Sequence, residues 1–167
     1  MNYYKEHIGK IENFPIEGIT YRDIQPLLAN PTVFMDAIKD MGNLLETKPD
    51  YWIALESRGF LFASALSMLF GGGVRLIRKK GKLGNNQLMS VDYGLEYGKD
   101  SFEMAYLPSF DLGKVVIVDD VYATGGTMKA AEGLCEKLGY EVSDKICLMD
   151  IGIVKNHDVK CLIKYDG

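Results

Sequence analysis

The spacing of apolar residues alternates along the chain between a pattern typical of buried strands and a pattern typical of helices. Short, nearly continuous apolar runs, as expected for strands covered on both faces, occupy residues 51–55, 74–77, 114–118, 146–149 and 161–163. Apolar residues at helical spacing occupy residues 31–45, 60–70 and 128–138. This alternation predicts an α/β fold in a single domain, residues 1–167, with a mostly parallel twisted sheet flanked by helices.

Glycine, proline and asparagine residues mark where these elements begin and end. Asn30 is a favoured N-cap and Pro31 suits the first helical position, so a helix is expected to begin there. Gly71 and Gly139 follow the next two predicted helices and are typical helix stops. Residues 1–13 are predicted to be a helical lead-in, followed by a turn-rich segment.

Residues 79–101 differ from the rest of the chain, because they are polar and show little apolar periodicity before Phe102. We predict a long loop here. Long loops inside a folded domain are usually functional or mobile, so this segment is a candidate part of a binding site.

The composition limits the classes of function. Of the 167 residues, 47% are hydrophobic and 25% are charged, which is ordinary for a soluble folded protein. The net charge of −4 argues against a general nucleic-acid binder, although not against a local basic pocket for a small anion. No apolar stretch approaches the roughly 20 residues of a membrane helix, and the first residues lack the pattern of a signal peptide.

The cysteines and histidines limit the chemistry further. Cys135, Cys147 and Cys161 are far apart and lie among apolar residues, so we expect buried, reduced thiols and a cytoplasmic protein. The two histidines, His7 and His157, are too far apart to indicate a structural zinc site. No Gly-x-Ser-x-Gly segment is present to carry a serine nucleophile.

The segment from Val115 to Thr127 carries the most chemical information, because a predicted buried strand ends in two acids and small residues then open a helix. Ligands of open α/β sheets bind at this edge, and a helix N-terminus offers free N–H groups to an anion. Gly125 and Gly126 let the backbone approach a phosphate closely. The segment therefore indicates a binding site for a phosphate monoester. The alternative interpretation is a turn with a purely structural role, in which these residues cap the helix and bind no ligand.

The two acids, Asp119 and Asp120, would repel a phosphate held directly against them. They fit a ligand whose sugar hydroxyls donate hydrogen bonds to them, or a ligand that brings a magnesium ion. A ribose 5-phosphate group meets both demands. The two other common phosphate loops, Gly-x-x-x-x-Gly-Lys-Ser/Thr and Gly-x-Gly-x-x-Gly, are absent from the sequence.

Residues 118–127 resemble the signature of the type I phosphoribosyltransferases, which bind 5-phosphoribosyl 1-pyrophosphate (PRPP). Further segments narrow the resemblance to the adenine branch of that family, and they occur in the family's order. They are Phe14–Leu28, Glu56–Phe60, Leu76–Leu83 and Leu95–Lys99. The resemblance implies the type I phosphoribosyltransferase fold, with a small hood built from the N-terminal segment, residues 1–30, and a flexible catalytic loop at residues 79–101.

The resemblance also implies an activity. The reaction is that of a pentosyltransferase in purine salvage, adenine + PRPP → AMP + pyrophosphate, with Mg²⁺ carried by PRPP rather than held by protein side chains. The implied partners are these small molecules and a second copy of the chain in a homodimer, with no nucleic acid and no membrane. Two alternatives stay open: another purine base (hypoxanthine, guanine or xanthine), and a non-catalytic PRPP-sensing regulator of the same fold.

Each matched position carries a role implied by the resemblance. The catalytic groups are Arg58, Glu96, Asp119 and Asp120, with Glu96 as general acid toward purine N7 and Tyr97 beside it in the loop. The ribose 5-phosphate is expected to contact Asp119, Asp120, Ala123, Thr124, Gly125, Gly126 and Thr127. The pyrophosphate is expected to contact Ser57, Arg58, Lys79 and Lys82, beside a Glu56–Ser57 peptide bond that is often cis in the family. The base is expected to contact Thr20, Tyr21 and Arg22, with the Tyr21 ring stacked on it.

Two departures from the family pattern bear on the expected ligand. Where the family has Lys-Leu-Pro-Gly, this chain has Lys82-Leu83-Gly84-Asn85, and loss of the proline loosens the loop. Residues 151–157 stand near the place of the family's Leu-Lys-Gly-Arg-Glu-Lys-Leu stretch, and the segment is shorter. Because that segment lies near the base in the family, the choice among purines is less determined than the binding of PRPP.

Overall fold

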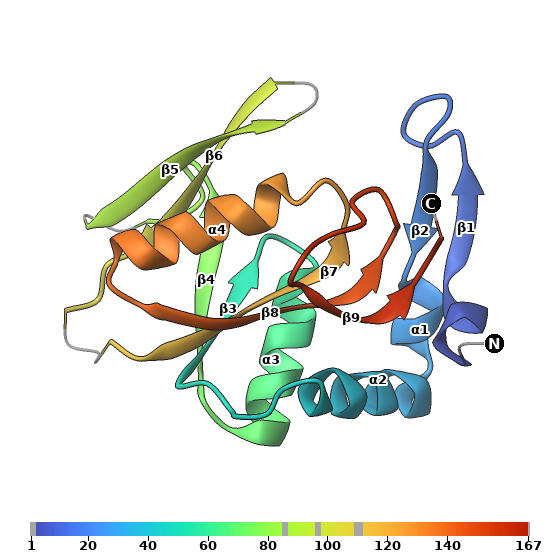
Figure 1. Ribbon diagram of the computed structural model, residues 1–167, viewed down its shortest axis with the longest axis horizontal. Coiled ribbons are helices and arrows are strands. Elements are labelled where there is room, and N and C mark those ends of the chain that lie inside the picture. Colours follow the sequence, from blue (N-terminus) through green and yellow to red (C-terminus); the bar gives the residue numbers. More distant parts are fainter. Residues whose placement is uncertain (1–2, 85–86, 96–97, 109–111, 167) are drawn as a thin grey trace.

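The largest element of the structure is a seven-stranded sheet with the strand order β5-β6-β4-β3-β7-β8-β9 (Figure 1). The computed structural model describes residues 3–84, 87–95, 98–108 and 112–166. The neighbouring parallel strands are β4 (Gly73–Lys79), β3 (Tyr51–Leu55), β7 (Lys114–Tyr122), β8 (Glu141–Asp150) and β9 (Lys160–Lys164). At one edge the antiparallel strands are β6 (Gly98–Ala105) and β5 (Leu88–Leu95). The predicted α/β fold with a mostly parallel sheet is confirmed.

Helices cover both faces of this sheet (Figure 1). The helices on one face are α1 (Gln25–Ala29), α2 (Pro31–Asn43) and α3 (Gly59–Phe70), and the helix on the other is α4 (Gly126–Lys137). Successive side chains of a strand point to opposite faces, so Val116 and Val118 join the core under α2 and α3, while Val115 and Ile117 join the core under α4. All four side chains are fully buried, which explains the continuous apolar run in the sequence.

The helix boundaries follow the predicted signals. The Asn30 side chain accepts hydrogen bonds from the backbone N–H groups of Thr32 and Val33, both at 3.2 Å, at the start of α2. Gly71 and Gly139 follow α3 and α4 with φ angles of 80° and 87°, which glycine adopts without strain. No helix among the described residues is long and apolar enough to cross a membrane.

The N-terminal segment forms the predicted small hood, a separate layer near the end of β9 (Figure 1). A 3₁₀ helix, η1 (Tyr3–His7), is followed by two antiparallel strands, β1 (Gly9–Glu12) and β2 (Thr20–Asp23). The helical lead-in predicted for residues 1–13 is therefore wrong for residues 9–12. These residues are a strand because they pair with β2, and local helical spacing does not reveal a contact with a later segment.

Residues 79–101, predicted to be a loop, are mostly a hairpin in which β5 and β6 pair along their length. The loop prediction is therefore wrong for residues 88–95 and 98–101. The alternation of apolar and polar residues is weak there, and strand formation depends on pairing of β6 with β4 and on the buried side chains of Phe102 and Met104. Whether the segment is flexible stays a prediction.

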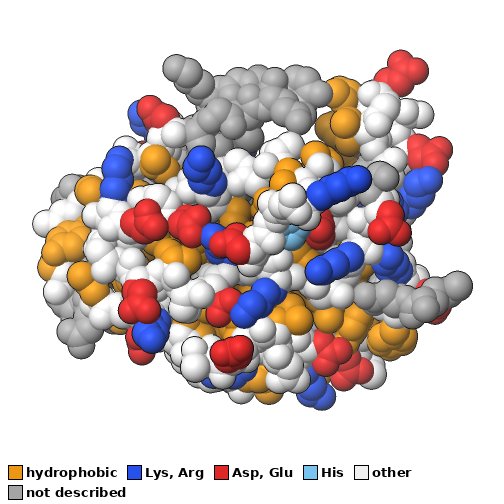
Figure 2. Space-filling view, in the orientation of Figure 1, with side chains coloured by type: hydrophobic (Ala, Val, Ile, Leu, Met, Phe, Trp, Pro, Cys, Tyr) orange, Lys and Arg blue, Asp and Glu red, His pale blue; other side chains and the backbone are white. Residues whose placement is uncertain are grey.

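Acidic and basic side chains are interspersed over the face shown in Figure 2. This mixture agrees with a net charge of only −4. Binding of an anionic ligand therefore depends on cations placed inside a cavity, and not on the average charge of the surface.

Candidate functional site

The candidate site lies at the carboxyl edge of the parallel strands, where β3 and β7 are neighbours in the sheet. Residues that follow β3 and residues at the end of β7 line one cavity of about 410 Å³. The residues that line it are Glu56, Ser57, Arg58, Lys79, Phe102, Asp119, Asp120, Val121, Ala123 and Thr127. The structure thus brings together residues from four segments that are far apart in the sequence.

The second acid of β7, Asp120, forms an ion pair with the arginine that follows β3. Arg58 Nε lies 2.9 Å from Asp120 Oδ2, and Asp120 is only 4% exposed. The backbone N–H of Asp120 donates to Asp119 Oδ1 at 2.9 Å. This arrangement places two carboxylates and one guanidinium on the same wall of the cavity.

Burial of these carboxyl groups changes their acidity. Although Asp119 as a whole residue keeps some contact with solvent, burial of its carboxyl group and the neighbouring Asp120 charge raise its pKa well above the usual value. Burial also raises the pKa of Asp120, while the Arg58 guanidinium acts in the opposite direction. The charged forms of both carboxyl groups are therefore stabilised most by a ligand that donates hydrogen bonds to them or carries positive charge.

The start of α4 forms a phosphate-sized recess beside these acids. Gly125 is the N-cap with a φ of 81°, and no side chain caps the helix, so its first N–H groups remain available to a ligand. A cavity of about 60 Å³ is lined by Asp119, Val121, Tyr122, Ala123, Thr124, Gly125, Thr127 and Met128. A Cβ at residue 125 would lie 2.6 Å from the Tyr122 hydroxyl, so glycine is required there for both conformation and space.

The loop after β3 is held by a carboxylate that the sequence interpretation did not single out. The Glu56–Ser57 peptide bond is cis, as the resemblance implied. The Glu56 carboxylate accepts a hydrogen bond from the backbone N–H of Lys79 at 2.8 Å and pairs with Arg78 at 3.2 Å. Although burial alone would raise the pKa of Glu56, these two hydrogen bonds lower it. Glu56 and Arg78 thus tie the loop after β3 to the end of β4.

The role of Glu56 could have been predicted from its position, since an acid directly after a buried strand needs a partner at the same sheet edge.

Another close contact fixes the same loop. A Cβ at Gly59, the first residue of α3, would lie 2.6 Å from the carbonyl oxygen of Val118. Only glycine therefore lets α3 begin so close to β7.

The hood contacts the site through Tyr21. Arg58 Nη1 donates a hydrogen bond to the Tyr21 hydroxyl at 2.9 Å, and the Tyr21 ring packs edge-on against Phe14 with a centroid distance of 5.4 Å. This hydrogen bond joins Tyr21, which is expected to bind the base, to Arg58, which is expected to bind the pyrophosphate. A phenylalanine at position 21 could not accept this hydrogen bond.

The remaining predicted residues are placed less centrally. Thr20, Arg22 and Lys82 are not among the residues that line the 410 Å³ cavity, and the Arg22 guanidinium lies over the Tyr165 ring, 4.0 Å from its centroid. The Lys82 backbone N–H donates to the carbonyl of Lys79 at 3.2 Å, close to the cavity edge. Glu96 and Tyr97 lie outside the described residues.

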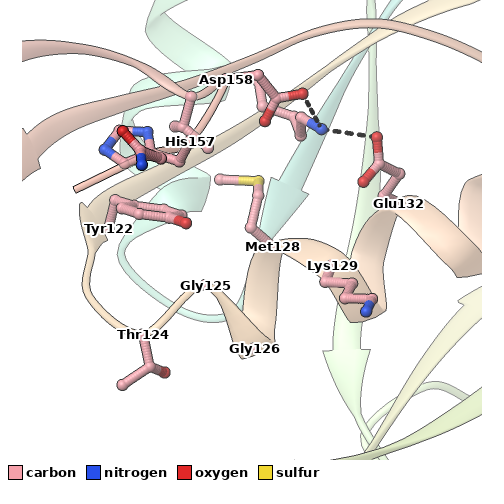
Figure 3. A pocket seen from close by; sticks show the side chains of 12 residues that line it. Tyr122, Thr124, Gly125, Gly126, Met128, Lys129, Glu132, His157 and Asp158 are labelled. Atoms are coloured by element: carbon pink, nitrogen blue, oxygen red, sulfur yellow. Dashed lines mark hydrogen bonds and ion pairs between the residues drawn. The ribbon is translucent and has the colours of Figure 1, made fainter. Parts of the chain in front are cut away.

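A second cleft of about 400 Å³ adjoins the start of α4 on its other side (Figure 3). Lys145 lies between Glu132 and Asp158, each at 2.7 Å. His157 Nε2 lies 3.0 Å from Asp150 Oδ2. In Figure 3, Thr124 points away from the Tyr122 and His157 side chains. Gly125 lines both this cleft and the 60 Å³ recess. This cleft could not be predicted from the sequence, because its residues come from four separate segments.

Metal binding by the protein alone is not indicated. Among the described residues, no group of three or more His, Cys, Asp or Glu side chains is placed to hold a metal ion. Asp119 and Asp120 offer oxygen atoms at one side of the cavity, which fits a magnesium ion whose other ligands come from substrate phosphates and water.

Comparison with known sequences gives consistent matches over almost the whole chain. The sequence pattern of the family described as "Phosphoribosyl transferase domain" matches residues 23–165. The adenine phosphoribosyltransferase of Hydrogenovibrio crunogenus is 41% identical over 96% of this chain and 95% of its own length. That of Methanococcus maripaludis is 38% identical over 97% of this chain and 98% of its own length.

Solved structures agree with these sequence matches. The crystal structure of adenine phosphoribosyltransferase from Thermoanaerobacter pseudethanolicus superposes with a TM-score of 0.87 at 38% identity, over 96% of this chain and 97% of that one. The Saccharomyces cerevisiae enzyme, crystallised with adenine and an imino-altritol bisphosphate, superposes with a TM-score of 0.82 at 35% identity, over 95% of each chain.

Proposed function

Because this chain belongs to the phosphoribosyl transferase family, we propose that it is an adenine phosphoribosyltransferase, which converts adenine and PRPP to AMP and pyrophosphate. The type I phosphoribosyltransferase fold predicted from the sequence is confirmed by the same matches. The assignment of adenine draws on relatives of known name that cover nearly the full chain, including one crystallised with adenine.

The observation that carries the proposal is the arrangement at the end of β7. Two carboxylates, Asp119 and Asp120, lie near the end of β7, and the short segment 121–125 joins them to a helix start that no side chain caps. The free N–H groups of α4 and the hydroxyls of Thr124 and Thr127 suit a 5′-phosphate. The carboxylates suit the hydroxyls of the attached ribose. Burial raises the pKa of both acids, so their charged forms are stabilised by a ligand that donates hydrogen bonds or carries positive charge.

The proposed chemistry is displacement of pyrophosphate from the anomeric carbon of the ribose by a nitrogen of the base. Positive charge develops on the sugar carbon and oxygen, and the Asp119 and Asp120 carboxylates stabilise it. Negative charge develops on the pyrophosphate, which Arg58, Lys79 and the backbone of Ser57 are proposed to contact, since all three residues line the cavity. Placing opposite charges where charge develops lowers the barrier, and a single such group is worth about 100- to 1,000-fold in rate.

Magnesium is proposed to enter with PRPP, because the protein offers carboxylate oxygens on one side only. Bound there, the ion would reduce the negative charge that the departing pyrophosphate accumulates. Asp119 and Asp120 are the residues that would face it. Lys82, just outside the cavity, would add positive charge once the ligand is present.

The base is proposed to lie between the hood and the cavity, against the Tyr21 ring, with backbone groups of Thr20 and Arg22 near the purine edge. Tyr21 is already fixed by its contacts with Arg58 and Phe14. Glu96 is proposed as the general acid toward purine N7, next to Tyr97, in the segment between β5 and β6. Closure of that segment would exclude water from the activated sugar.

A homodimer is proposed from an apolar groove of about 510 Å³ between α2 and α3, on the sheet face away from α4. The residues that line it are Leu28, Pro31, Phe34, Met35, Ile38, Ala65, Met68 and Leu69. Three of these side chains, Met35, Met68 and Leu69, are 48%, 88% and 44% exposed, so the groove presents a contiguous apolar surface. Met68→Asp is expected to convert a dimer to a monomer in sedimentation velocity, whereas Met89→Asp, on the far hairpin, leaves the dimer intact. A wild-type chain that sediments as a monomer at all concentrations contradicts this proposal.

A cytoplasmic location is proposed from the cysteines. Cys135, Cys147 and Cys161 are buried free thiols, as the sequence predicted. Burial raises the pKa of Cys135 to about 12, so its thiol stays protonated and unreactive. Unpaired cysteines of this kind are typical of a reducing compartment.

A substrate panel tests the proposed function. The purified chain is incubated with PRPP, Mg²⁺ and each of adenine, hypoxanthine, guanine and xanthine, and pyrophosphate release is measured. We expect adenine to give the highest kcat/KM. Preference for an oxopurine would favour the second enzyme hypothesis. PRPP binding in calorimetry without turnover of any base would favour the sensor hypothesis.

A further inference from the structure

Arg75 is a charged residue in the interior at the end of the sheet opposite the candidate site. It lies in β4, four residues before Lys79, and pairs across the parallel ladder with Ile53. It is only 7% exposed. Four residues of strand span about 13 Å, so Arg75 is well separated from the cavity that Lys79 lines.

The partners of Arg75 are neutral. Its Nη1 donates to the Tyr140 hydroxyl, and its Nη2 donates to the carbonyl oxygen of Ala105 at 2.6 Å. Its guanidinium also lies 5.9 Å from the ring centroid of Tyr51 and 5.6 Å from that of Tyr140. In the described part of the chain, Arg75 pairs with no carboxylate, and these two hydrogen bonds engage two of its five N–H donors.

An arginine buried in this way is costly unless an anion compensates its charge. Aromatic faces compensate only part of it, because a cation–π contact is weaker than a charge-assisted hydrogen bond. The absence of an acid among the described partners of Arg75 is therefore an unexplained feature of the fold.

A cavity of about 230 Å³ opens onto this guanidinium. The residues that line it are Arg75, Tyr106, Leu107, Pro108, Leu112, Leu138 and Tyr140. Apart from the guanidinium and two tyrosines, the walls are aliphatic. Such walls disfavour a strongly hydrated dianion such as phosphate and favour a compact apolar group that carries a single negative charge.

We propose that this cavity, which we name the Arg75 pocket, binds a small organic carboxylate, with the carboxylate on Arg75 and an apolar body against Leu112, Leu138 and Pro108. The planar guanidinium has the donor geometry that a carboxylate accepts. The tyrosine rings provide flat walls for an aromatic or aliphatic body. The site is separate from the PRPP cavity and does not depend on the proposed function.

Benzoate is a suitable probe, with benzamide as the neutral control of the same shape. We expect benzoate to raise the melting temperature of the wild-type chain in a concentration-dependent way and to give saturation-transfer NMR signals. Benzamide and inorganic phosphate are expected to bind at least about ten-fold more weakly, since one charge-assisted hydrogen bond contributes that factor or more. Equal binding of benzoate and benzamide, or binding of neither, overturns the proposal.

Variants locate the site. Arg75→Gln is expected to weaken benzoate binding at least about ten-fold. Since Arg75→Gln also removes buried contacts, Leu112→Glu provides a second test, because Leu112 is 55% exposed and tolerates substitution. Leu112→Glu supplies a carboxylate at the mouth and is expected to weaken benzoate binding more than Leu112→Gln, which has the same shape without the charge and loses only the apolar contact of Leu112. Equal effects of the two Leu112 variants overturn the proposal.

One further variant tests whether the carboxylate that pairs with Arg75 comes from a bound ligand or from the chain itself. Asp111 precedes Leu112 in the sequence and lies outside the described residues. Asp111→Asn is expected to leave benzoate affinity unchanged. Benzoate binding that appears only in Asp111→Asn would mean that the chain supplies its own carboxylate, and it would overturn the proposal.

Discussion

Two arginines at opposite ends of the parallel strands are held in opposite ways. Arg58, after β3, has a carboxylate partner, with Nε 2.9 Å from Asp120 Oδ2. Arg75, within β4, has a hydroxyl and a carbonyl as its hydrogen-bond acceptors in the described part of the chain. The Arg58 side chain is 35% exposed, whereas Arg75 is 7% exposed.

The two ends of the sheet differ in whether a carboxylate compensates the charge of the arginine. At the carboxyl edge, Arg58 and Asp120 neutralise each other, so an anionic substrate has to compete with Asp120 for the guanidinium. At the other end, Arg75 has no competing acid among its described partners, and one of its two acceptors, the Tyr140 hydroxyl, belongs to a buried residue. Substitutions on the partners of each arginine therefore affect different properties: turnover at the first end and stability at the second.

The largest effect is expected from Asp120→Asn. Loss of one negative charge beside the developing positive charge should lower kcat for AMP formation about 100- to 1,000-fold. The matched control is Asp144→Asn, which removes a carboxylate 2.6 Å from Lys160, between β8 and β9. Steady-state kinetics and thermal unfolding are measured on both variants. If Asp120→Asn loses stability as severely as it loses activity, the assigned role is wrong.

The next largest effect is expected from Tyr140→Phe, which removes an acceptor of the Arg75 guanidinium and keeps the ring. The unpaired buried donor should lower the free energy of unfolding by about 1–3 kcal/mol. Urea denaturation measures this difference. AMP formation at a temperature well below the unfolding transition should be unchanged, since Tyr140 is remote from the PRPP cavity. A change of less than about 0.5 kcal/mol would mean that water reaches Arg75.

A smaller effect, and one of opposite sign, is expected from Asp119→Asn. The folded state holds the pKa of Asp119 above its unfolded value of 3.8, because of burial and the Asp120 charge. The wild-type chain therefore loses stability as the pH rises from about pH 4 through the raised pKa. The asparagine keeps the acceptor for the Asp120 N–H without the charge, and should increase the free energy of unfolding by about 1 kcal/mol at neutral pH.

The pH dependence checks this prediction. The stability difference between wild type and Asp119→Asn should disappear on acidification below about pH 4, where Asp119 is protonated in both the folded and the unfolded state. Urea denaturation across this range measures it. A difference that is constant with pH would show that the Asp119 carboxyl is not buried against Asp120.

The smallest effect is expected from Tyr21→Phe. It removes the hydrogen bond from Arg58, but Arg58 is exposed enough to bond to water instead. The free energy of unfolding should change by less than about 0.5 kcal/mol. The KM for PRPP should fall or stay constant, because the guanidinium is released toward the pyrophosphate. A large stability loss would show that this contact holds the hood in place.

The sequence predicted the elements whose signals are local. The buried part of β7, Val115 to Val118, was visible as a β-branched run, and α2 was visible from its Asn30 cap and apolar spacing. The short helix α1 was not predicted, and the strands β1, β2, β5 and β6 were missed because their stability is not local. β1 depends on pairing with β2, and the β5–β6 hairpin depends on pairing with β4.

The same division holds for the candidate site. The chemical groups could be predicted from the residues alone: the two acids, the glycines that allow close approach, and the arginine after β3. The folded chain was needed to show that the Tyr21 hydroxyl accepts a hydrogen bond from Arg58, that Arg78 and Glu56 join two strand ends, and that Arg75 lacks an acid among its described partners. The physical reason is that backbone preferences act between near neighbours in the chain, whereas charge pairing and burial depend on distances in space.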